Sequence, residues 1–286
     1  MRLGGFVRPQ SLAELEASVE TLDTYGLSTV VAPRGINEMT DDEAAAYGER
    51  ARELGIVVGE AIPGVNLLTR DLDARTQRIE TCRTMLRKCE LMHCHGIVIL
   101  VGSPVPEDYH AAPDPYLFTD ECKAEWREVV LRIVDGLDLE HARVLIEPWN
   151  HSFFYRTQPV LEFMQSVDDP RVAVHLDLMN MIDQDHIFRT TELIDEAFDL
   201  LGPYVGGVHF KDLAWDWHHM FLKLDEVLIG DGVIDYPTYV RRVSELDGDI
   251  ACFCEHLQEE GEFAINFARL HKIAADLGTS FKRRGE

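Results

Sequence analysis

The sequence has no apolar run long enough to cross a membrane and no apolar stretch at its start. Its longest apolar runs, such as residues 96–101, are much shorter than the roughly 20 residues that a transmembrane helix needs. Residues 1–10 lack the hydrophobic core of a signal peptide. We therefore expect a cytoplasmic protein without a membrane partner.

Positive charge is scarce. Lysine and arginine number 27 against 51 aspartates and glutamates, which gives a formal net charge of −24. The one tight basic cluster, Lys282-Arg283-Arg284, stands at the extreme end of the sequence. An acidic surface repels phosphate backbones, so we expect no nucleic-acid partner.

The cysteines form no CxxC pair and no regular framework. Such spacing in a chain of this size indicates buried thiols rather than disulfides or zinc ligands. The prediction covers all six of them: Cys82, Cys89, Cys94, Cys122, Cys252 and Cys254.

Short β-rich runs alternate with amphipathic helical patterns along the whole sequence. This alternation, without a flexible linker, predicts an α/β fold, a single (β/α)8 TIM barrel domain over residues 1–286. A doubly wound open sheet is the alternative, and the absence of GxGxxG after the first strand disfavours it. The eight runs are Leu3–Val7, Ser28–Pro33, Ile56–Ile62, Gly96–Val101, Arg143–Pro148, Arg171–Leu178, Val205–Lys211 and Ile250–His256.

Two long irregular segments follow predicted strands, residues 104–120 and residues 214–235. Long loops in a compact domain are usually functional or disordered. The second contains Trp215, Trp217 and Phe221. We expect both segments to lie over the mouth of the barrel as lids.

Four of the later runs each end in a residue that can bind a metal ion. Glu147, Asp177, His209 and Glu255 follow apolar residues at the ends of successive predicted strands. In a parallel barrel the carboxyl ends of the strands converge on one mouth, where the active sites of such enzymes lie. The sequence therefore predicts that these four side chains meet there.

One acidic residue or histidine at a strand end is more often solvated or hydrogen-bonded than metal-binding. Four on successive strands change that balance, because three carboxylates in contact would repel one another without a cation. Three carboxylates and an imidazole, without a thiolate, suit Mn²⁺, Mg²⁺ or Co²⁺ better than structural zinc. We predict one divalent ion, Mn²⁺ first, with Mg²⁺ and Co²⁺ as alternatives.

The same strand ends carry short motifs: Ile146-Glu147-Pro148, His175-Leu176-Asp177, Val-His-Phe-Lys-Asp over 208–212, Gly-Asp-Gly-Val-Ile-Asp-Tyr over 230–236, and Cys254-Glu255-His256. In these motifs the chain resembles the sugar phosphate isomerase/epimerase family, the xylose isomerase-like barrels, over essentially its whole length. The resemblance implies the four metal ligands named above and a sugar or polyol substrate.

Two positions depart from that resemblance. Ketose epimerases of the family carry a second glutamate shortly after the Glu-Pro motif and a histidine three residues after the metal aspartate. Phe153 and Asn180 stand there instead. The second carboxylate of the epimerase proton shuttle is therefore missing, and Asn180 interrupts the multi-histidine, multi-zinc set of the endonuclease relatives.

Residues 147–151 and 175–181 are similar to the catalytic subunits of bacterial C-glycoside deglycosidases, divergent members of the same superfamily. That similarity implies cleavage of the sugar–aglycone carbon bond of a 3-oxo-glycoside, with a smaller partner subunit in a hetero-oligomer. His151 is the expected general base, because an imidazole titrates near neutrality; a loop-capping histidine is the other interpretation. Lys211 is expected to stabilise negative charge that develops on the substrate.

The sequence thus favours a metal-dependent carbon–carbon lyase acting on an oxidised sugar conjugate. A ketose or sugar phosphate isomerase/epimerase working through an enediolate is the first alternative. A non-catalytic, metal-stabilised sugar-binding subunit is the second. The residues expected to contact the small-molecule sugar or glycoside are Trp149, Asn150, Phe153, Asn180, Trp215 and Trp217. For the aromatic ones, the alternative is that they only fill the barrel mouth.

Overall fold

The computed structural model describes residues 1–246 and 248–286. Its strands form a six-stranded parallel sheet in the order β1-β10-β7-β6-β5-β4, a parallel pair β2-β3, and a small hairpin β8-β9. The parallel strands are β1 (Arg2–Gly4), β2 (Thr29–Val31), β3 (Val57–Glu60), β4 (Gly96–Ile99), β5 (Arg143–Ile146), β6 (Val172–Asp177), β7 (Val205–Phe210) and β10 (Ala251–Cys254).

Hydrogen bonds just outside the strand limits join the pair β2-β3 to both edges of the larger sheet. The Ser28 amide donates to the Leu3 carbonyl at 3.0 Å, which links β2 to β1. The Ala61 amide donates to the Gly96 carbonyl at 2.9 Å, which links β3 to β4. The parallel strands therefore close into a barrel, and the predicted (β/α)8 fold is confirmed.

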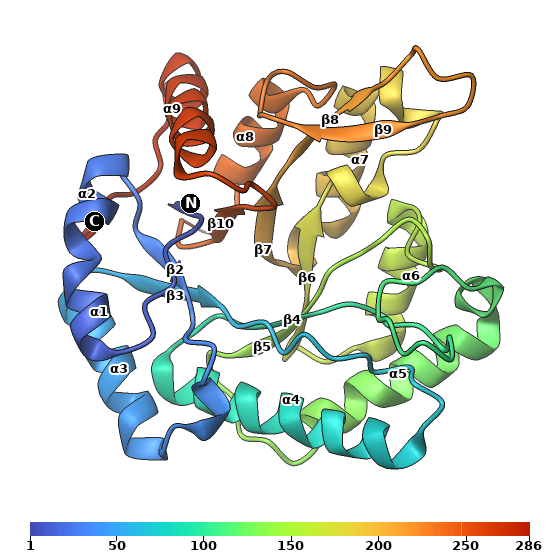
Figure 1. Cartoon of the computed structure of the whole chain (residues 1–286), viewed down its shortest axis with the longest axis horizontal. Coiled ribbons are helices and arrows are strands. Elements are labelled where there is room, and N and C mark those ends of the chain that lie inside the picture. Colours follow the sequence, from blue (N-terminus) through green and yellow to red (C-terminus); the bar gives the residue numbers. More distant parts are fainter. Residues whose placement is uncertain (247) are drawn as a thin grey trace.

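Helices surround the strands, which lie at the centre of the molecule (Figure 1). Most parallel strands are followed by a helix that returns the chain to the start of the next strand, as a parallel barrel requires. The helices are α1 (Leu12–Ala17), α2 (Val19–Tyr25), α3 (Asp41–Glu53), α4 (Leu72–Met92), α5 (Asp120–Val134), α6 (Thr157–Val167), α7 (Thr190–Leu201), α8 (Tyr236–Ser244) and α9 (Glu260–Asp276), with short 3-10 turns η1 (Ile36–Glu38), η2 (Pro115–Phe118), η3 (Met179–Met181), η4 (His186–Phe188) and η5 (Gly202–Tyr204).

Local sequence signals fix several helix ends. The Ser11 side chain accepts the amide of Glu14 at the start of α1. Thr40 and Glu43 form a reciprocal capping box at the start of α3, which satisfies two amides that the helix itself cannot. Gly26 ends α2 in the left-handed conformation, with φ of 66°, which costs glycine least.

The segment 214–235 differs from the irregular loop that the sequence predicts. Its first half continues β8 (Asp212–Trp215) into an antiparallel hairpin with β9 (Leu224–Val227), which projects beyond the barrel strands (Figure 1). Trp215 pairs with Leu224 across the hairpin. Cross-strand pairs of large apolar side chains stabilise such hairpins. Strands this short leave little periodicity in the sequence, so the sequence alone predicts a loop.

The structure agrees with two of the absences in the sequence. No helix among the described residues is long and apolar enough to cross a membrane. All six cysteines are buried free thiols, as predicted.

Gly48 marks a close approach of α3 to the end of α4. A Cβ atom at this position would overlap the backbone carbonyl of Met92, at the end of α4. Gly48→Ala should therefore lower the free energy of unfolding by about 1–3 kcal/mol, because an added methyl group in a packed contact forces backbone shifts. The midpoint of urea unfolding measures the change.

Gly261 provides the matched control, since it lies in the first turn of α9 with nothing within 4 Å of an added Cβ. Gly261→Ala should leave stability unchanged or raise it by up to about 1 kcal/mol, because alanine favours the helix. Equal effects of the two substitutions would contradict the close approach of α3 and α4.

Candidate metal centre

The barrel brings together the four residues that the sequence predicts as metal ligands. Asp177 and His209 lie within β6 and β7, while Glu147 and Glu255 directly follow β5 and β10. One potential ligand atom from each lies within 4.8 Å of those of the other three. Parallel register places these strand ends at the same mouth, since Asp177 pairs with His209 across β6 and β7.

The His209 ring stands at the centre of this group. Its Nδ1 lies 3.1 Å from Glu255 Oε2, 3.4 Å from Glu147 Oε1 and 3.9 Å from Asp177 Oδ2. Asp177 and His209 are fully buried and Glu147 nearly so, while Glu255 is partly exposed. One edge of the imidazole therefore faces three carboxylates from three other strands.

Lys211 reaches into the same group from the end of β7. Its Nζ lies 2.5 Å from Asp177 Oδ2, 2.9 Å from Glu255 Oε2 and 3.6 Å from Glu147 Oε1. The side chain is almost completely buried. With a neutral His209 ring, as a metal ligand requires, three carboxylates and one ammonium leave a formal charge of −2, which attracts a divalent cation.

Burial and the neighbouring charges act in opposite directions on the acidic groups. Burial raises the pKa of Asp177 to about 6, although Lys211 opposes the shift. Burial also acts against ionisation of Glu147, but the positive charges of His209 and Lys211 lower its pKa to about 2. The pKa of Glu255 is lowered too, because His209 and Lys211 outweigh burial. At neutral pH these groups are therefore mainly ionised.

Asn180 supports the group from the turn η3. Its Nδ2 donates to Glu147 Oε1 at 2.7 Å, and the amide of Met179 donates to Asp177 Oδ1 at 3.0 Å. These bonds fix the direction of two carboxylates. Asn180, which the sequence suggests as a substrate contact, thus also holds a predicted ligand.

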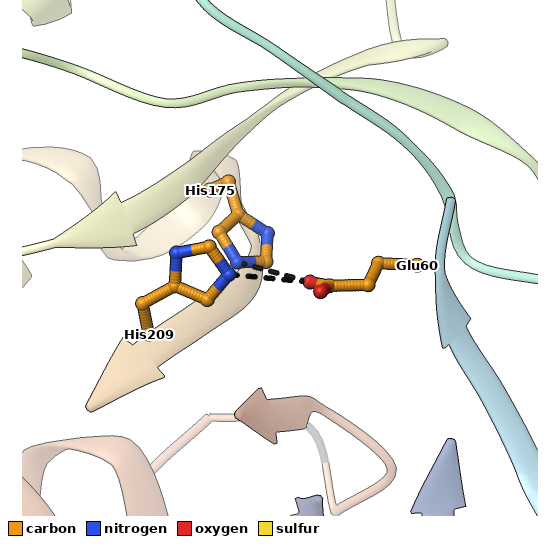
Figure 2. A group of neighbouring side chains, drawn as sticks. All are labelled: Glu60, His175 and His209. Carbon is orange, nitrogen blue, oxygen red and sulfur yellow. Dashed lines mark hydrogen bonds and ion pairs between the residues drawn. The ribbon is translucent and has the colours of Figure 1, made fainter. Parts of the chain in front are cut away.

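A second group, which the sequence reasoning missed, lies against the other edge of His209 (Figure 2). Glu60 Oε2 is 3.3 Å from His209 Nε2 and 3.5 Å from His175 Nε2, and all three side chains are buried. Glu60 ends β3, so the strand-end rule that found the other ligands applies to it as well. His175 stands two residues before Asp177 and therefore shares its face of β6.

Asp212 explains the Gly-Asp-Gly-Val-Ile-Asp-Tyr motif. Its Oδ2 accepts the amides of Gly230 and Gly232 at 2.9 and 3.2 Å, and its Oδ1 accepts that of Ile234 at 3.2 Å. A Cβ at Gly232 would overlap this carboxylate. Tyr236, the last residue of the motif, donates its hydroxyl to the Lys211 carbonyl at 2.8 Å. The motif therefore braces the end of β7, next to His209 and Lys211.

A cavity of about 320 Å³ opens beside the predicted ligands. Glu147, His209, Lys211 and Glu255 form its ionic wall, and the turn after β3 and the loop after β4 form much of the rest. Those other lining residues are Ile62, Pro63, Gly64, Val65, Val98, Ile99, Leu100, Tyr109, His110, Ala111, Trp149, Asn180 and His256. One wall is thus charged and the other largely apolar.

His256 separates this cavity from a neighbouring one of about 460 Å³, and both share Lys211 and Glu255. Its backbone has φ of 61°, a left-handed conformation that is uncommon for residues other than glycine. Its Nδ1 lies 2.9 Å from Glu226 Oε1 of β9. The hairpin therefore contacts the residue next to Glu255.

The remaining predicted site residues lie at different distances from the cavity. Trp149 lines it, and the His151 ring packs against that of Trp149 with centroids 4.4 Å apart. His151 itself is not among the lining residues. Asn150 is held in the loop, with its Nδ2 donating to the Ile182 carbonyl at 3.2 Å.

Three of the predicted aromatic contacts point elsewhere. Phe153 is buried against Phe154 and Phe163. Trp215 packs against Phe188 at a centroid distance of 5.6 Å, and Trp217 is 75% exposed on the hairpin. None of the three lines the cavity, so its aromatic wall comes from Trp149 and Tyr109 instead.

Comparison with known proteins agrees with this architecture. Three solved structures share the fold: the IOLI protein with a bound zinc atom (17% identity, TM-score 0.67, 97% of this chain and 98% of that chain), D-psicose 3-epimerase in the presence of D-fructose (19%, 0.63, 94% and 89%) and the 3-keto-D-glucoside 4-epimerase YcjR from E. coli (14%, 0.64, 96% and 99%). None of the curated proteins matches the sequence.

The family model described as xylose isomerase-like TIM barrel matches residues 19–276. This range includes all four predicted metal ligands, from Glu147 to Glu255. The match confirms the resemblance seen in the strand-end motifs. The chain belongs to the xylose isomerase-like TIM barrel family.

Proposed function

We propose that this protein is a metal-dependent enzyme that removes a proton next to the ketone of an oxidised sugar conjugate and then cleaves its C-glycosidic bond. The observation that carries the proposal is the cavity, whose lining combines the ionic wall with a largely apolar set of side chains. The ionic wall suits a polyhydroxylated keto-sugar. The apolar wall, with Ile62, Val98 and Trp149, suits an aromatic aglycone.

The residues of the ionic wall fit a divalent cation. Donor atoms bound to one ion at about 2.1 Å lie roughly 3–3.5 Å apart, and His209 Nδ1 stands 3.1 and 3.4 Å from Glu255 and Glu147. Glu147, Asp177, His209 and Glu255 would hold the ion, and we expect Mn²⁺. When bound, it supplies electrophilic stabilisation of negative charge on a ketone oxygen.

The chain's own polar groups would orient the sugar. Lys211 and Asn180 line the cavity beside Glu147. Both contact predicted ligands, but an ammonium has three N–H donors and an amide two, so a remaining donor of each would serve substrate oxygens. Because Lys211 is nearly buried, its charge is poorly screened and acts strongly on negative charge developing nearby. Trp149 offers a flat surface for the aglycone.

His151 is the proposed proton acceptor. Burial lowers its pKa below the usual value, so the ring is neutral and able to accept a proton at pH 7. Its ring packs against that of Trp149, which lines the cavity, so proton transfer requires a movement of that side chain or a relaying water.

The proposed reaction is a β-elimination. The base takes a proton from the carbon next to the ketone, and the C–H electron pair forms a carbon–carbon double bond. The bond from the sugar to the aglycone breaks, and the aglycone carbon takes up a proton. No oxidant or reductant is consumed, because the ketone is already present in the substrate.

A second candidate, ketose isomerisation or epimerisation, starts with the same proton removal. It needs a second group to return the proton, and two histidines of the cavity wall, His110 and His256, are placed for that role. The carboxylates of that wall, Glu147 and Glu255, are both predicted ligands. Phe153, where a second glutamate would stand, is buried in the core. These two features favour elimination.

The direct test is to incubate the Mn²⁺-loaded protein with 3-oxo-C-glycosides and with free and phosphorylated ketoses in D₂O. The expected result is release of free aglycone, detected by mass spectrometry. A parallel series of incubations contains added small subunits of C-glycoside deglycosidases. Deuterium uptake into an intact or rearranged ketose would establish the second candidate instead. No release and no exchange with any substrate would refute an enzymatic role.

Removal of a predicted ligand should remove the ion. In Glu255→Gln and His209→Ala we expect less than half an equivalent of bound metal after dialysis, measured by elemental analysis. The melting temperature of the wild type should rise with added Mn²⁺, since the ion binds only the folded state, and this rise should vanish in both variants. Asp225→Asn, an exposed carboxylate of β9, is the control. A full equivalent in both ligand variants would refute the site.

His151→Ala should leave metal content intact while turnover falls by roughly 10²–10⁴-fold, as for a lost general base. The wild-type rate should rise with pH as the imidazole loses its proton. Because burial lowers this pKa, the rise should lie below about pH 6.5 and disappear in the variant. The control variant Asn150→Ala should keep this rise of the rate with pH. Normal turnover of His151→Ala, with loss in His110→Ala, would place the base on the cavity wall.

A further inference from the structure

The two ring nitrogens of His209 face different surroundings. Nδ1 faces the carboxylates of the cavity, with Glu255 Oε2 at 3.1 Å. Nε2 faces away from the cavity, toward Glu60 Oε2 at 3.3 Å (Figure 2). Glu60 comes from β3, which is not a neighbour of β7 in the barrel, so this contact crosses the interior.

A neutral imidazole carries one N–H group and one lone pair, and its neighbours decide which nitrogen has which. A metal ligand must present the lone pair toward the ion. An ionised carboxylate can only accept hydrogen bonds. A carboxylate beside Nε2 therefore keeps the proton on Nε2 and leaves the lone pair on Nδ1, directed at Glu147 and Glu255.

Glu60 has no access to the cavity itself. Its side chain is 1% exposed, and it is absent from the lining of the cavity beside the predicted ligands. A carboxylate buried to this degree is unstable unless it is paired. The partners within ion-pair distance are His209 and His175, so its position is explained by the imidazoles and not by solvent or substrate.

His175 lies against the same oxygen of this carboxylate, Oε2, at 3.5 Å. Its ring packs edge-on against that of His209, with centroids 4.0 Å apart, and its Nε2 points to Glu60 (Figure 2). A Cβ on Gly207, its cross-strand neighbour, would overlap His175 Nδ1. The ring is therefore confined by packing, while the hydrogen bond to Glu60 comes from His209 alone of the two imidazoles.

We propose that Glu60 is a positioning residue for the metal centre: it accepts a hydrogen bond from the Nε2–H group of His209 and so fixes the ring with Nδ1 toward the cation. The inference rests on the proposed metal site and adds a residue outside the four ligands. Partners of this kind typically change metal affinity by 10- to 100-fold when removed, about the effect expected here. The conservative variant Glu60→Gln should recover part of that loss in metal affinity, because its amide oxygen can still accept the hydrogen bond from His209 Nε2–H.

The test compares the whole wild-type chain with Glu60→Ala, Glu60→Gln and a matched control, His175→Gln, which leaves the Glu60–His209 contact in place. Mn²⁺ and Zn²⁺ affinities and stoichiometry are measured by chelator competition, and circular dichroism of each ion-free variant verifies folding. We expect Glu60→Ala to bind one equivalent about 10- to 100-fold more weakly. The affinity of Glu60→Gln should fall between those of Glu60→Ala and the wild type. The affinity of His175→Gln should stay within about threefold of the wild-type value.

A second readout follows the proton itself. The Zn²⁺-loaded wild type should show a downfield ring N–H resonance in ¹⁵N-histidine NMR, assigned by its absence in His209→Ala. It should persist in Glu60→Gln and be lost or strongly shifted in Glu60→Ala. A residue that merely fills space would not move this signal.

Three results would overturn the proposal, and they are distinguishable. Unchanged affinity in folded Glu60→Ala would show that Glu60 has no influence on the ion. Two equivalents in the wild type and one in Glu60→Ala would make Glu60 and His175 ligands of a second ion. A wild type that binds no divalent ion would refute the metal site and this inference together. Metal binding as expected without turnover on any keto-sugar would refute only the proposed function.

Discussion

The site depends on the electrostatic balance among three carboxylates and Lys211. Two like charges about 4 Å apart repel by about 4 kcal/mol at an effective dielectric constant near 20, so Glu147, Asp177 and Glu255 could not share a buried position alone. Lys211 Nζ lies within 3.6 Å of all three. It stands two residues after His209 and so shares its face of the chain. The His-x-Lys spacing thereby sets both cationic groups against the acids.

The sequence predicts this part of the molecule well because it follows from periodicity. A strand that is apolar throughout and ends in a single polar residue places that residue at the mouth of a parallel barrel. Glu147, Asp177, His209 and Glu255 were recognised in this way, and the structure brings them together. The same rule would have found Glu60, at the end of a run of small and apolar residues. His175 lies inside its strand, and only the alternation of side chains places it on the same face as Asp177.

The loops were predicted less well, for a physical reason. Which way Phe153 or Trp217 points depends on tertiary packing and not on strand periodicity. Phe153 joins the core beside Phe163, while Trp217 lies on an exposed hairpin. The wall opposite the ligands comes instead from segments without an obvious motif, such as Pro63-Gly64 and Tyr109-His110. Proximity in sequence to a ligand, as for His151, does not ensure access to the cavity.

The engagement of Lys211 has a consequence for the charge of molecules that the cavity accepts. Among the described residues lining that cavity, Lys211 is the single lysine and arginine is absent, and its ammonium already neutralises part of an acidic cluster. Without the proposed cation, a phosphate ester entering here would meet a net negative field with no guanidinium to bind it. A phosphate or carboxylate group would therefore depend on the proposed cation for a positive partner, and we expect neutral glycoconjugates to be the preferred ligands.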